Sequence, residues 1–313
     1  MPGALPVRGR VPRVFLLAAV AALLIVGGCA RMPDTGKTSL RFADYRGMQT
    51  YLLGNKADVD LFRLRGPFEV AVQEDVELRL PGAGLVRADQ YLAVHPDKAP
   101  LVILVHGHDN SKDDHAYQAL HLASWGMHAL AVQLPNTGPW IANGRTLAKL
   151  AEAIARRPEL IDPRVDPGRI VLVGHSFGGA SVAVALAESA PAAGGILLDP
   201  AVVGRGFPGF FAKVKKPVLL LGADEEISLA RNRDFFFHYI PAGVGEVSLK
   251  DTVHEDAEFP LEDDPARQAA RLTYVSTLTA AAFSVAATGK FDYVWASLAG
   301  GMEKGRFFNV KKK

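Results

Sequence analysis

The stretch that decides the fold is GRIVLVGHSFGGASVAVALAES, residues 168–189. An apolar run ends at Val173, glycines surround a serine at positions 174–179, and a helical pattern of small and apolar residues follows. A strand, a G-x-S-x-G turn and a helix in this order lift the serine hydroxyl above the edge of a sheet. The hydroxyl then lies at a helix N-terminus, where the helix dipole favours developing negative charge. The stretch therefore predicts that Ser176 is a nucleophile on a strained turn; the alternative is a serine that only caps the helix.

Strand and helix patterns alternate along the rest of the chain. Period-two alternation predicts an antiparallel start at 68–80 and 85–96. Continuous apolar runs predict strands buried on both faces at 99–108, 127–135, 168–176, 193–200 and 216–225. Helical spacing predicts helices at 114–126, 143–157, 179–189 and 264–289. The predicted fold class is α/β, with a mostly parallel central sheet, antiparallel N-terminal strands, helices on both faces and no obvious lid domain.

Length and composition indicate one ordinary globular domain. The chain has 313 residues, a formal charge of +2 and one cysteine, and it shows no repeat or linker. The charge gives no reason to expect nucleic acid as a partner, and one cysteine excludes a cysteine-based zinc site. We expect a single domain over residues 58–310, with the final VKKK as an exposed tail.

The N-terminus has the pattern of a bacterial lipoprotein signal peptide. A basic leader with arginines at positions 8, 10 and 13 precedes an uncharged run at 14–28, which is shorter than the roughly 20 residues of a spanning helix. Val26-Gly27-Gly28-Cys29 resembles the box in which the cysteine is lipidated and becomes the new N-terminus. We therefore expect a signal peptide at 1–28, lipidation of Cys29 with acyl chains such as palmitate, and a tether at 29–57. An uncleaved anchor, or a plain signal with a chance cysteine, is the alternative.

This N-terminus predicts a location as well. The protein would be exported and held at the bacterial envelope by the lipid on Cys29. The residue after the cysteine is Ala30 and not aspartate, which favours the outer membrane.

A nucleophilic serine needs a histidine base that is held by a carboxylate. In folds that present a nucleophilic serine on such a strand–turn–helix elbow, the chain order is serine, acid, histidine, so only His238 and His254 qualify. His238 lies in an aromatic helical segment, whereas His254 lies in a loop between a strand-like GEVSL and the last long helix. We expect His254 to be the base. His175, next to the serine, is expected to pack and not to catalyse.

Two carboxylates qualify as the acid. Asp199 ends the strand at 193–200, and Asp224 follows the next strand. Both lie at carboxyl ends of strands, so the spacing alone leaves the choice open.

The reaction also needs donors to the developing oxyanion. One is expected to be the backbone N–H of Phe177, directly after the serine, and the other the N–H of His108, or of Gly107, after the strand at 99–105. The side chains of His106 and His108 are expected to be structural.

Several segments resemble the α/β-hydrolase superfamily, and within it the platelet-activating-factor acetylhydrolases, the chlorophyllases and the cutinase- and dienelactone-hydrolase-like serine esterases. They are LVHGHDNS at 104–111, LASWGMHALAVQLP at 122–135, GHSFGGA at 174–180, LLDPAVVG at 197–204 and VHEDAEF at 253–259. The resemblance implies an α/β-hydrolase fold and favours Asp199 as the acid. Asp224 stays open, because cutinase-like members place the acid after the later strand. The segment GADEEISLARNRDFFFHY at 222–239 matches none of these families well.

The expected activity is hydrolysis of a small-molecule carboxylic ester through an acyl-enzyme on Ser176, without a metal or an organic cofactor. A peptidase or amidase with the same triad is one alternative. A non-catalytic envelope lipoprotein that uses the scaffold for binding is another. The sequence indicates no oligomeric state.

Overall fold

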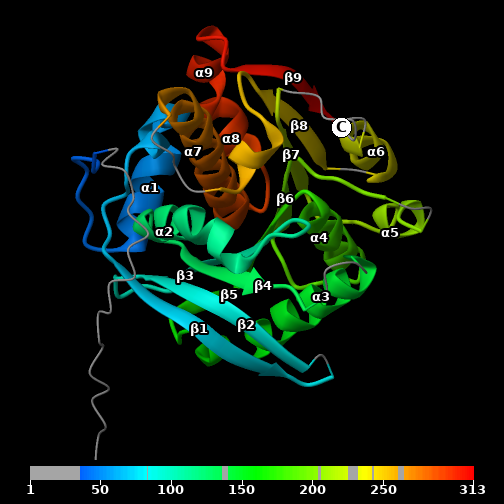
Figure 1. Cartoon of the computed structure of the whole chain (residues 1–313). Coiled ribbons are helices and arrows are strands. Elements are labelled where there is room, and N and C mark those ends of the chain that lie inside the picture. Colours follow the sequence, from blue (N-terminus) through cyan, green and yellow to red (C-terminus); the bar gives the residue numbers. More distant parts are fainter. Residues whose placement is uncertain are drawn as a thin grey trace, which may run out of the picture.

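The computed structural model describes residues 36–82, 84–135, 140–203, 206–224, 232–241, 243–259 and 264–313. In this part of the chain nine strands form one sheet, in the order β1-β2-β4-β3-β5-β6-β7-β8-β9 (Figure 1). The strands are β1 (Val70–Leu80), β2 (Gly84–Ala93), β3 (Ala99–Val105), β4 (His128–Gln133), β5 (Val165–His175), β6 (Gly194–Leu198), β7 (Val218–Gly222), β8 (Val244–Leu249) and β9 (Phe307–Lys312). The six central strands are parallel, whereas β1, β2 and β9 run antiparallel to their neighbours.

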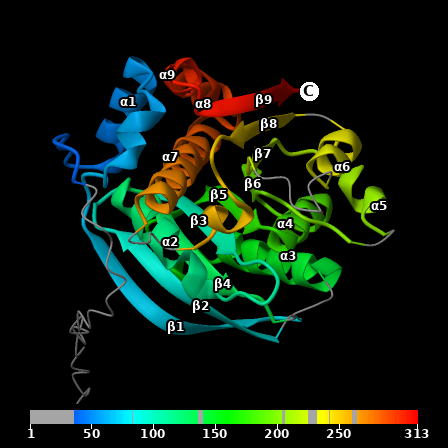
Figure 2. The ribbon, with the colours of Figure 1, turned by 45° about the horizontal axis from the view of Figure 1, so that its top comes forward.

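Helices cover both faces of the sheet (Figures 1 and 2). One face carries α1 (Tyr45–Asn55), the 3-10 turn η1 (Val59–Arg63), α2 (Ala116–Ser124), α7 (Pro265–Thr288) and α8 (Asp292–Ser297). The other carries α3 (Trp140–Arg156), α4 (Phe177–Ala187), α5 (Pro208–Phe211) and α6 (Asn232–Tyr239). The remaining short elements are η2 (Lys112–His115), η3 (Pro158–Leu160), η4 (His254–Ala257) and α9 (Ala299–Glu303).

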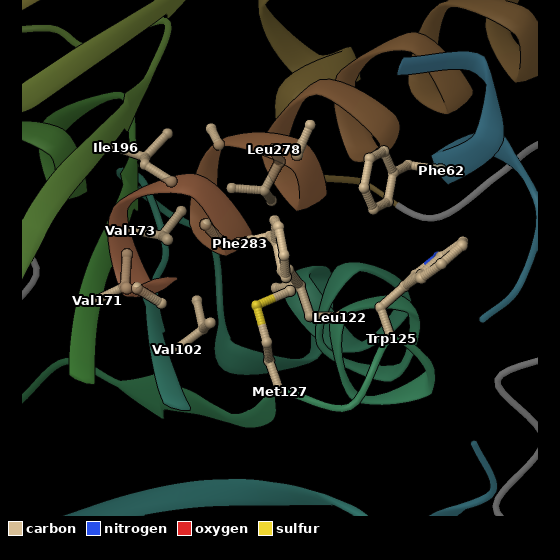
Figure 3. Close-up of a cluster of buried hydrophobic side chains, with 14 of the residues drawn as sticks. Phe62, Val102, Leu122, Trp125, Met127, Val171, Val173, Ile196, Leu278 and Phe283 are labelled. Atoms are coloured by element: carbon tan, nitrogen blue, oxygen red, sulfur yellow. The ribbon is translucent and has the colours of Figure 1, made fainter. Parts of the chain in front are cut away.

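Strand residues divide between two hydrophobic cores because successive side chains point to opposite faces. In β5, Val171 and Val173 join the core under α2 and α7, whereas Ile170 and Leu172 join the core under α3 and α4. Figure 3 shows the first core, where Phe283 of α7 packs near Met127 and Leu122. Since the central strands are buried on both faces, their apolar runs are continuous, as expected for a parallel sheet.

The long helix α7 starts and stops at residues suited to those roles. Asp264 caps it, because its side chain accepts a 2.9 Å hydrogen bond from the N–H of Ala266, and Pro265 occupies the first turn. Gly289 ends it in the left-handed conformation with a φ of 69°. The helix expected at 264–289 is therefore present.

The expected boundary between tether and domain at residue 57 is wrong. The described chain already packs on the domain from residue 36. The backbones of Lys37 and Arg65 form an isolated parallel β-bridge, and α1 buries Met48 and Leu52 in the core beside α2 and α7. Apolar residues three and four positions apart give α1 a face that must be covered.

The C-terminal VKKK is mostly exposed, as expected, but it is not an unpaired tail. Residues Phe307–Lys312 form β9, which pairs antiparallel with β8 from Leu249↔Phe307 to Gly245↔Lys312. The ammonium of Lys312 lies 4.4 Å from the centre of the Trp295 ring, so the side chain is held over the indole and its charge is favourably placed.

The expected signal peptide and Cys29 lie outside the described residues. Within the described residues, no helix combines the length and the apolar character needed to span a membrane.

Candidate active site

Ser176 occupies a strained turn between β5 and α4. Its φ of 52° and ψ of −124° are unfavourable for a residue with a Cβ, and such strain persists only where the surroundings enforce it. The neighbouring strand provides that support, since the N–H of Ser176 donates to the carbonyl of Leu198 over 3.0 Å, and the N–H of Ala201 donates to the carbonyl of Ser176 over 3.0 Å. The serine is 7% exposed. The turn therefore has the geometry of a nucleophile elbow.

Close packing explains two of the glycines around this turn. A Cβ at Gly178 would lie 2.5 Å from the carbonyl oxygen of His106, so helix α4 can approach the end of β3 only with glycine there. A Cβ at Gly107 would lie 3.1 Å from the Cβ of Ser176 and 3.1 Å from Nδ1 of His175. The loop after β3 therefore lies directly against the elbow.

Asp199 and His254 form a hydrogen-bonded pair near the elbow. Asp199 follows β6, the parallel neighbour of β5, and has a φ of 36°. His254 begins η4 after β8, and its Nδ1 donates to Oδ2 of Asp199 over 2.6 Å. The imidazole of His254 also packs on that of His175, with 4.4 Å between ring centres. This contact brings the pair next to the residue that precedes Ser176.

The surroundings keep Asp199 ionised. Its Oδ1 accepts a 3.0 Å hydrogen bond from the N–H of Ala223, and Nη1 of Arg233 lies 3.8 Å away. Burial acts to raise the pKa of Asp199, but the hydrogen bond and charge of His254, the Ala223 N–H and the Arg233 charge together lower it below its ordinary value. An ionised Asp199 holds His254 in the tautomer with a proton on Nδ1.

Asp224 lies at the same edge of the sheet but has a different partner. Its Oδ2 accepts a 2.8 Å hydrogen bond from the N–H of Asp251, and its own N–H donates to the carbonyl of Thr252. The carboxylate thus braces the turn that leads from β8 to His254. Of the two acids that the spacing left open, Asp199 is the one bonded to the histidine.

The other histidine after Ser176 lies elsewhere. His238 is exposed on α6, where its ring contacts that of Tyr239. His175 is buried, and its Nε2 donates to the carbonyl of His254 over 3.0 Å. It therefore supports the loop that carries His254.

The loop after β3 supplies backbone groups near Ser176. The N–H of Gly107 donates to Oε1 of Glu258 over 3.1 Å, which removes it as the alternative oxyanion donor. The carbonyl of Gly107 accepts from Nδ1 of His106 over 2.8 Å. Because a trans peptide group points its C=O and N–H in opposite directions, the N–H of His108 faces away from that contact. Phe177 is the first residue of α4, where backbone N–H groups have no partner within the helix.

Aromatic side chains lie beside the elbow. The rings of Trp140 and Phe177 stack with 5.2 Å between their centres, and the ring of His108 meets both edge-on. The side chain of His108 is 52% exposed. This group provides an apolar wall next to Ser176.

Sequence reasoning missed two charged residues of the site. Glu258 is fully buried between the loop after β3, His175 and His115, and it stands one helical turn after His254. Arg233 is 8% exposed and comes from the segment at 222–239 that matched no family well. An acid at that spacing and an arginine among aromatic residues were visible signals, but nothing in the sequence linked them to their partners.

The comparisons with known proteins agree with this architecture. A family model described as the alpha/beta hydrolase family matches residues 102–300, from within β3 to within α9. The match covers well over half of the chain and includes Ser176, Asp199 and His254. No curated protein matches the chain. With its sheet order, its elbow and this match, the chain belongs to the alpha/beta hydrolase family.

Proposed function

We propose that this protein is a serine hydrolase that cleaves carboxylic esters with short or accessible acyl groups. The observation that carries the proposal is the 2.6 Å hydrogen bond from His254 to Asp199. The same His254 imidazole packs against the ring of His175, the residue before Ser176. A histidine held in this tautomer keeps Nε2 available to accept a proton. Ser176, His254 and Asp199 then have the roles of nucleophile, base and orienting acid.

The acylation step follows from these roles. His254 Nε2 takes the proton of the Ser176 hydroxyl as Oγ attacks the ester carbonyl, and the carbonyl oxygen becomes an oxyanion. In this proposal the N–H groups of Phe177 and His108 donate to it, and each such donor is worth about 2.7–4 kcal/mol. As the tetrahedral intermediate collapses, His254 returns the proton to the leaving alkoxide, and the alcohol departs.

Deacylation repeats the sequence with water. His254 takes a proton from water as its oxygen attacks the acyl-enzyme, and the same N–H groups stabilise the second oxyanion. Collapse of that intermediate returns the proton to Ser176 and releases the carboxylic acid. Every proton in this cycle moves through His254, and the cycle as proposed requires no metal or organic cofactor.

The substrate class is inferred from the surroundings of Ser176. The stacked pair of Trp140 and Phe177 offers an apolar surface to an acyl or alcohol group, and the sequence predicts no lid domain. We expect short p-nitrophenyl esters to be cleaved faster than emulsified long-chain triglycerides. The reverse order would contradict this substrate class.

Active-site labelling tests the proposal. A fluorophosphonate should add to Ser176 of the wild-type chain and leave the Ser176→Ala variant unlabelled, with the site assigned by peptide mass spectrometry. Release of p-nitrophenol should disappear in the same variant. No adduct at Ser176 would refute catalysis and favour a non-catalytic binding scaffold, and faster cleavage of matched anilides than esters would favour an amidase.

We also propose that Cys29 carries the lipid that holds the enzyme at the bacterial envelope. Its support is the sequence pattern at 8–29. Expression with a palmitate analogue should label the wild-type chain and not Cys29→Ala, and the wild-type chain should fractionate with outer membranes. Equal labelling of both would refute lipidation at this cysteine.

A further inference from the structure

One buried carboxylate lies where three parts of the candidate active site meet. Glu258 accepts hydrogen bonds from the N–H of Gly107, the side-chain amide of Asn110 and Nδ1 of His175. Nε2 of His115 lies 3.2 Å from its Oε1. The side chain is fully buried, so these groups replace all of its water. A carboxylate is costly to bury unless it is paired and hydrogen-bonded.

The partner that balances the charge is His175. A carbonyl oxygen can only accept, so the 3.0 Å contact with the carbonyl of His254 requires a proton on Nε2 of His175. Nδ1 of the same ring faces the Glu258 carboxylate. Burial opposes charge on both groups, but the charges of His175 and His115 and the hydrogen bonds lower the pKa of Glu258 to about 2. Against the opposing effect of burial, the Glu258 charge and hydrogen bond raise the pKa of His175. The two therefore form an imidazolium–carboxylate pair.

Two successive peptide groups of the loop after β3 are fixed by side chains. Glu258 holds the N–H of Gly107, and His106 holds the carbonyl of Gly107. These contacts set the rotation of the peptide groups on either side of Gly107. The second group carries the N–H of His108, which is the proposed oxyanion donor. A small rotation there would turn the donor away from the oxyanion.

We propose that Glu258 is a positioning residue for catalysis. It orients the loop after β3, here called the oxyanion loop, and connects this loop to the nucleophile elbow and to the loop that carries His254. The inference rests on the proposed hydrolase function. Through Gly107 and Asn110 the carboxylate reaches the oxyanion loop, and through His175 it reaches both Ser176 and the backbone of His254. The pair formed by the Glu258 carboxylate and the His175 imidazolium has no net charge. The carboxylate therefore does not repel the oxyanion that forms nearby.

The test is Glu258→Gln in the full chain, with Glu255→Gln as the matched control. Glu255 is exposed on the same short helix as His254, and no side-chain bond of it is seen among the described residues. With a soluble p-nitrophenyl ester, we expect Glu258→Gln to lower kcat about 10–100-fold and to change KM by less than about threefold, since a loss of transition-state stabilisation affects kcat. Affinity for a trifluoromethyl ketone, which forms a tetrahedral adduct on Ser176, should fall in parallel with kcat/KM. Glu255→Gln should behave as wild type.

A second variant keeps the test valid if Glu258→Gln does not fold. Asn110→Ala removes one partner of Glu258 from a partly exposed loop position, and it should lower kcat about 3–10-fold without changing the thermal unfolding midpoint. The proposal is overturned if a folded Glu258→Gln and Asn110→Ala both retain the wild-type kcat and ketone affinity while wild-type Ser176 labels normally. A wild-type chain that neither labels nor turns over would instead overturn the proposed function, and with it this inference.

Discussion

At the scale of single residues, Asp199 and Asp224 differ in what they hold. Asp199 accepts from the His254 imidazole, whereas Asp224 accepts from the backbone of Asp251. We expect Asp199→Asn to lower kcat about 10³–10⁴-fold, because an amide no longer fixes the tautomer of His254. Asp224→Asn should lower it less than about tenfold. Steady-state kinetics on a soluble ester give the kcat of both variants. A larger loss of kcat in Asp224→Asn than in Asp199→Asn would reassign the acid.

The Arg233 guanidinium is a buried cation near Asp199, and replacing it should lower mainly the stability of the fold. This guanidinium donates to the carbonyl of Ala223 over 2.9 Å and to the hydroxyl of Ser248 over 3.0 Å. Arg233→Met leaves the Ala223 carbonyl and the Ser248 hydroxyl without this donor and removes the cation near Asp199, so we expect the free energy of unfolding to fall by about 2–4 kcal/mol. Urea titration of the wild type and the variant measures this change in the free energy of unfolding. Arg145→Met, which breaks the exposed pair with Glu188 and the contact of the guanidinium with the Phe210 ring, should cost less than about 1 kcal/mol.

The residues of the site were predictable to different extents from the sequence. Ser176 and His254 follow from a local motif and from chain order. The spacing alone did not give the acid, because Asp199 and Asp224 both end parallel strands, and only the family resemblance favoured Asp199. The path of the loop from β8 decides which of the two carboxylates meets His254. Glu258 was out of reach for another reason: its partners Gly107 and Asn110 lie about 150 positions away in the chain.

At the scale of whole elements, α1 belongs to the hydrophobic core of the domain. Leu52 is fully buried, and Leu53, next to it on the same helix, is 37% exposed. Leu52→Ala should lower the free energy of unfolding by about 2–5 kcal/mol, because it removes buried methyl groups and leaves a cavity. Leu53→Ala should change it by less than about 1 kcal/mol. Equal effects in denaturant titrations would show that α1 does not pack as described.

Elements were predicted well where their pattern was strong. The central strands and the helices that follow them agree with the apolar runs, since strands covered on both faces must be apolar throughout. Helix α1 and strand β9 were missed. Three buried positions in α1 are a weak periodic signal, and the edge strand β9 is mostly exposed and rich in polar and charged residues, so it lacks an apolar pattern.

At the scale of the whole molecule, buried histidines make the fold sensitive to acid. Burial lowers the pKa values of His121 and His128 to about 4, well below the ordinary 6.5. Below pH 6.5 the unfolded chain binds protons that the folded chain does not, so stability falls as the pH decreases from about 6.5 to 4. Each histidine accounts for at most about 3 kcal/mol of this loss at pH 4.

His128→Leu isolates one of these groups. Among the described residues neither ring nitrogen of His128 has a hydrogen-bond partner, so leucine removes the titration without breaking a bond. Thermal or urea unfolding should show a smaller loss of stability between pH 6.5 and 4 than in wild type. His238→Gln, at an exposed position, should follow the wild-type curve. An unchanged pH dependence in His128→Leu would contradict the assignment.

If Cys29 carries the proposed lipid, the early packing of the chain on its domain limits how far the domain lies from the membrane. A free tether over residues 29–57 would extend to about 100 Å at roughly 3.5 Å per residue. Because the chain is held on the domain from Lys37 onward, the seven residues after Cys29 span at most about 25 Å. A lipid on Cys29 would then hold the domain close to the membrane surface. Ser176 would then reach only esters in the layer next to the bilayer.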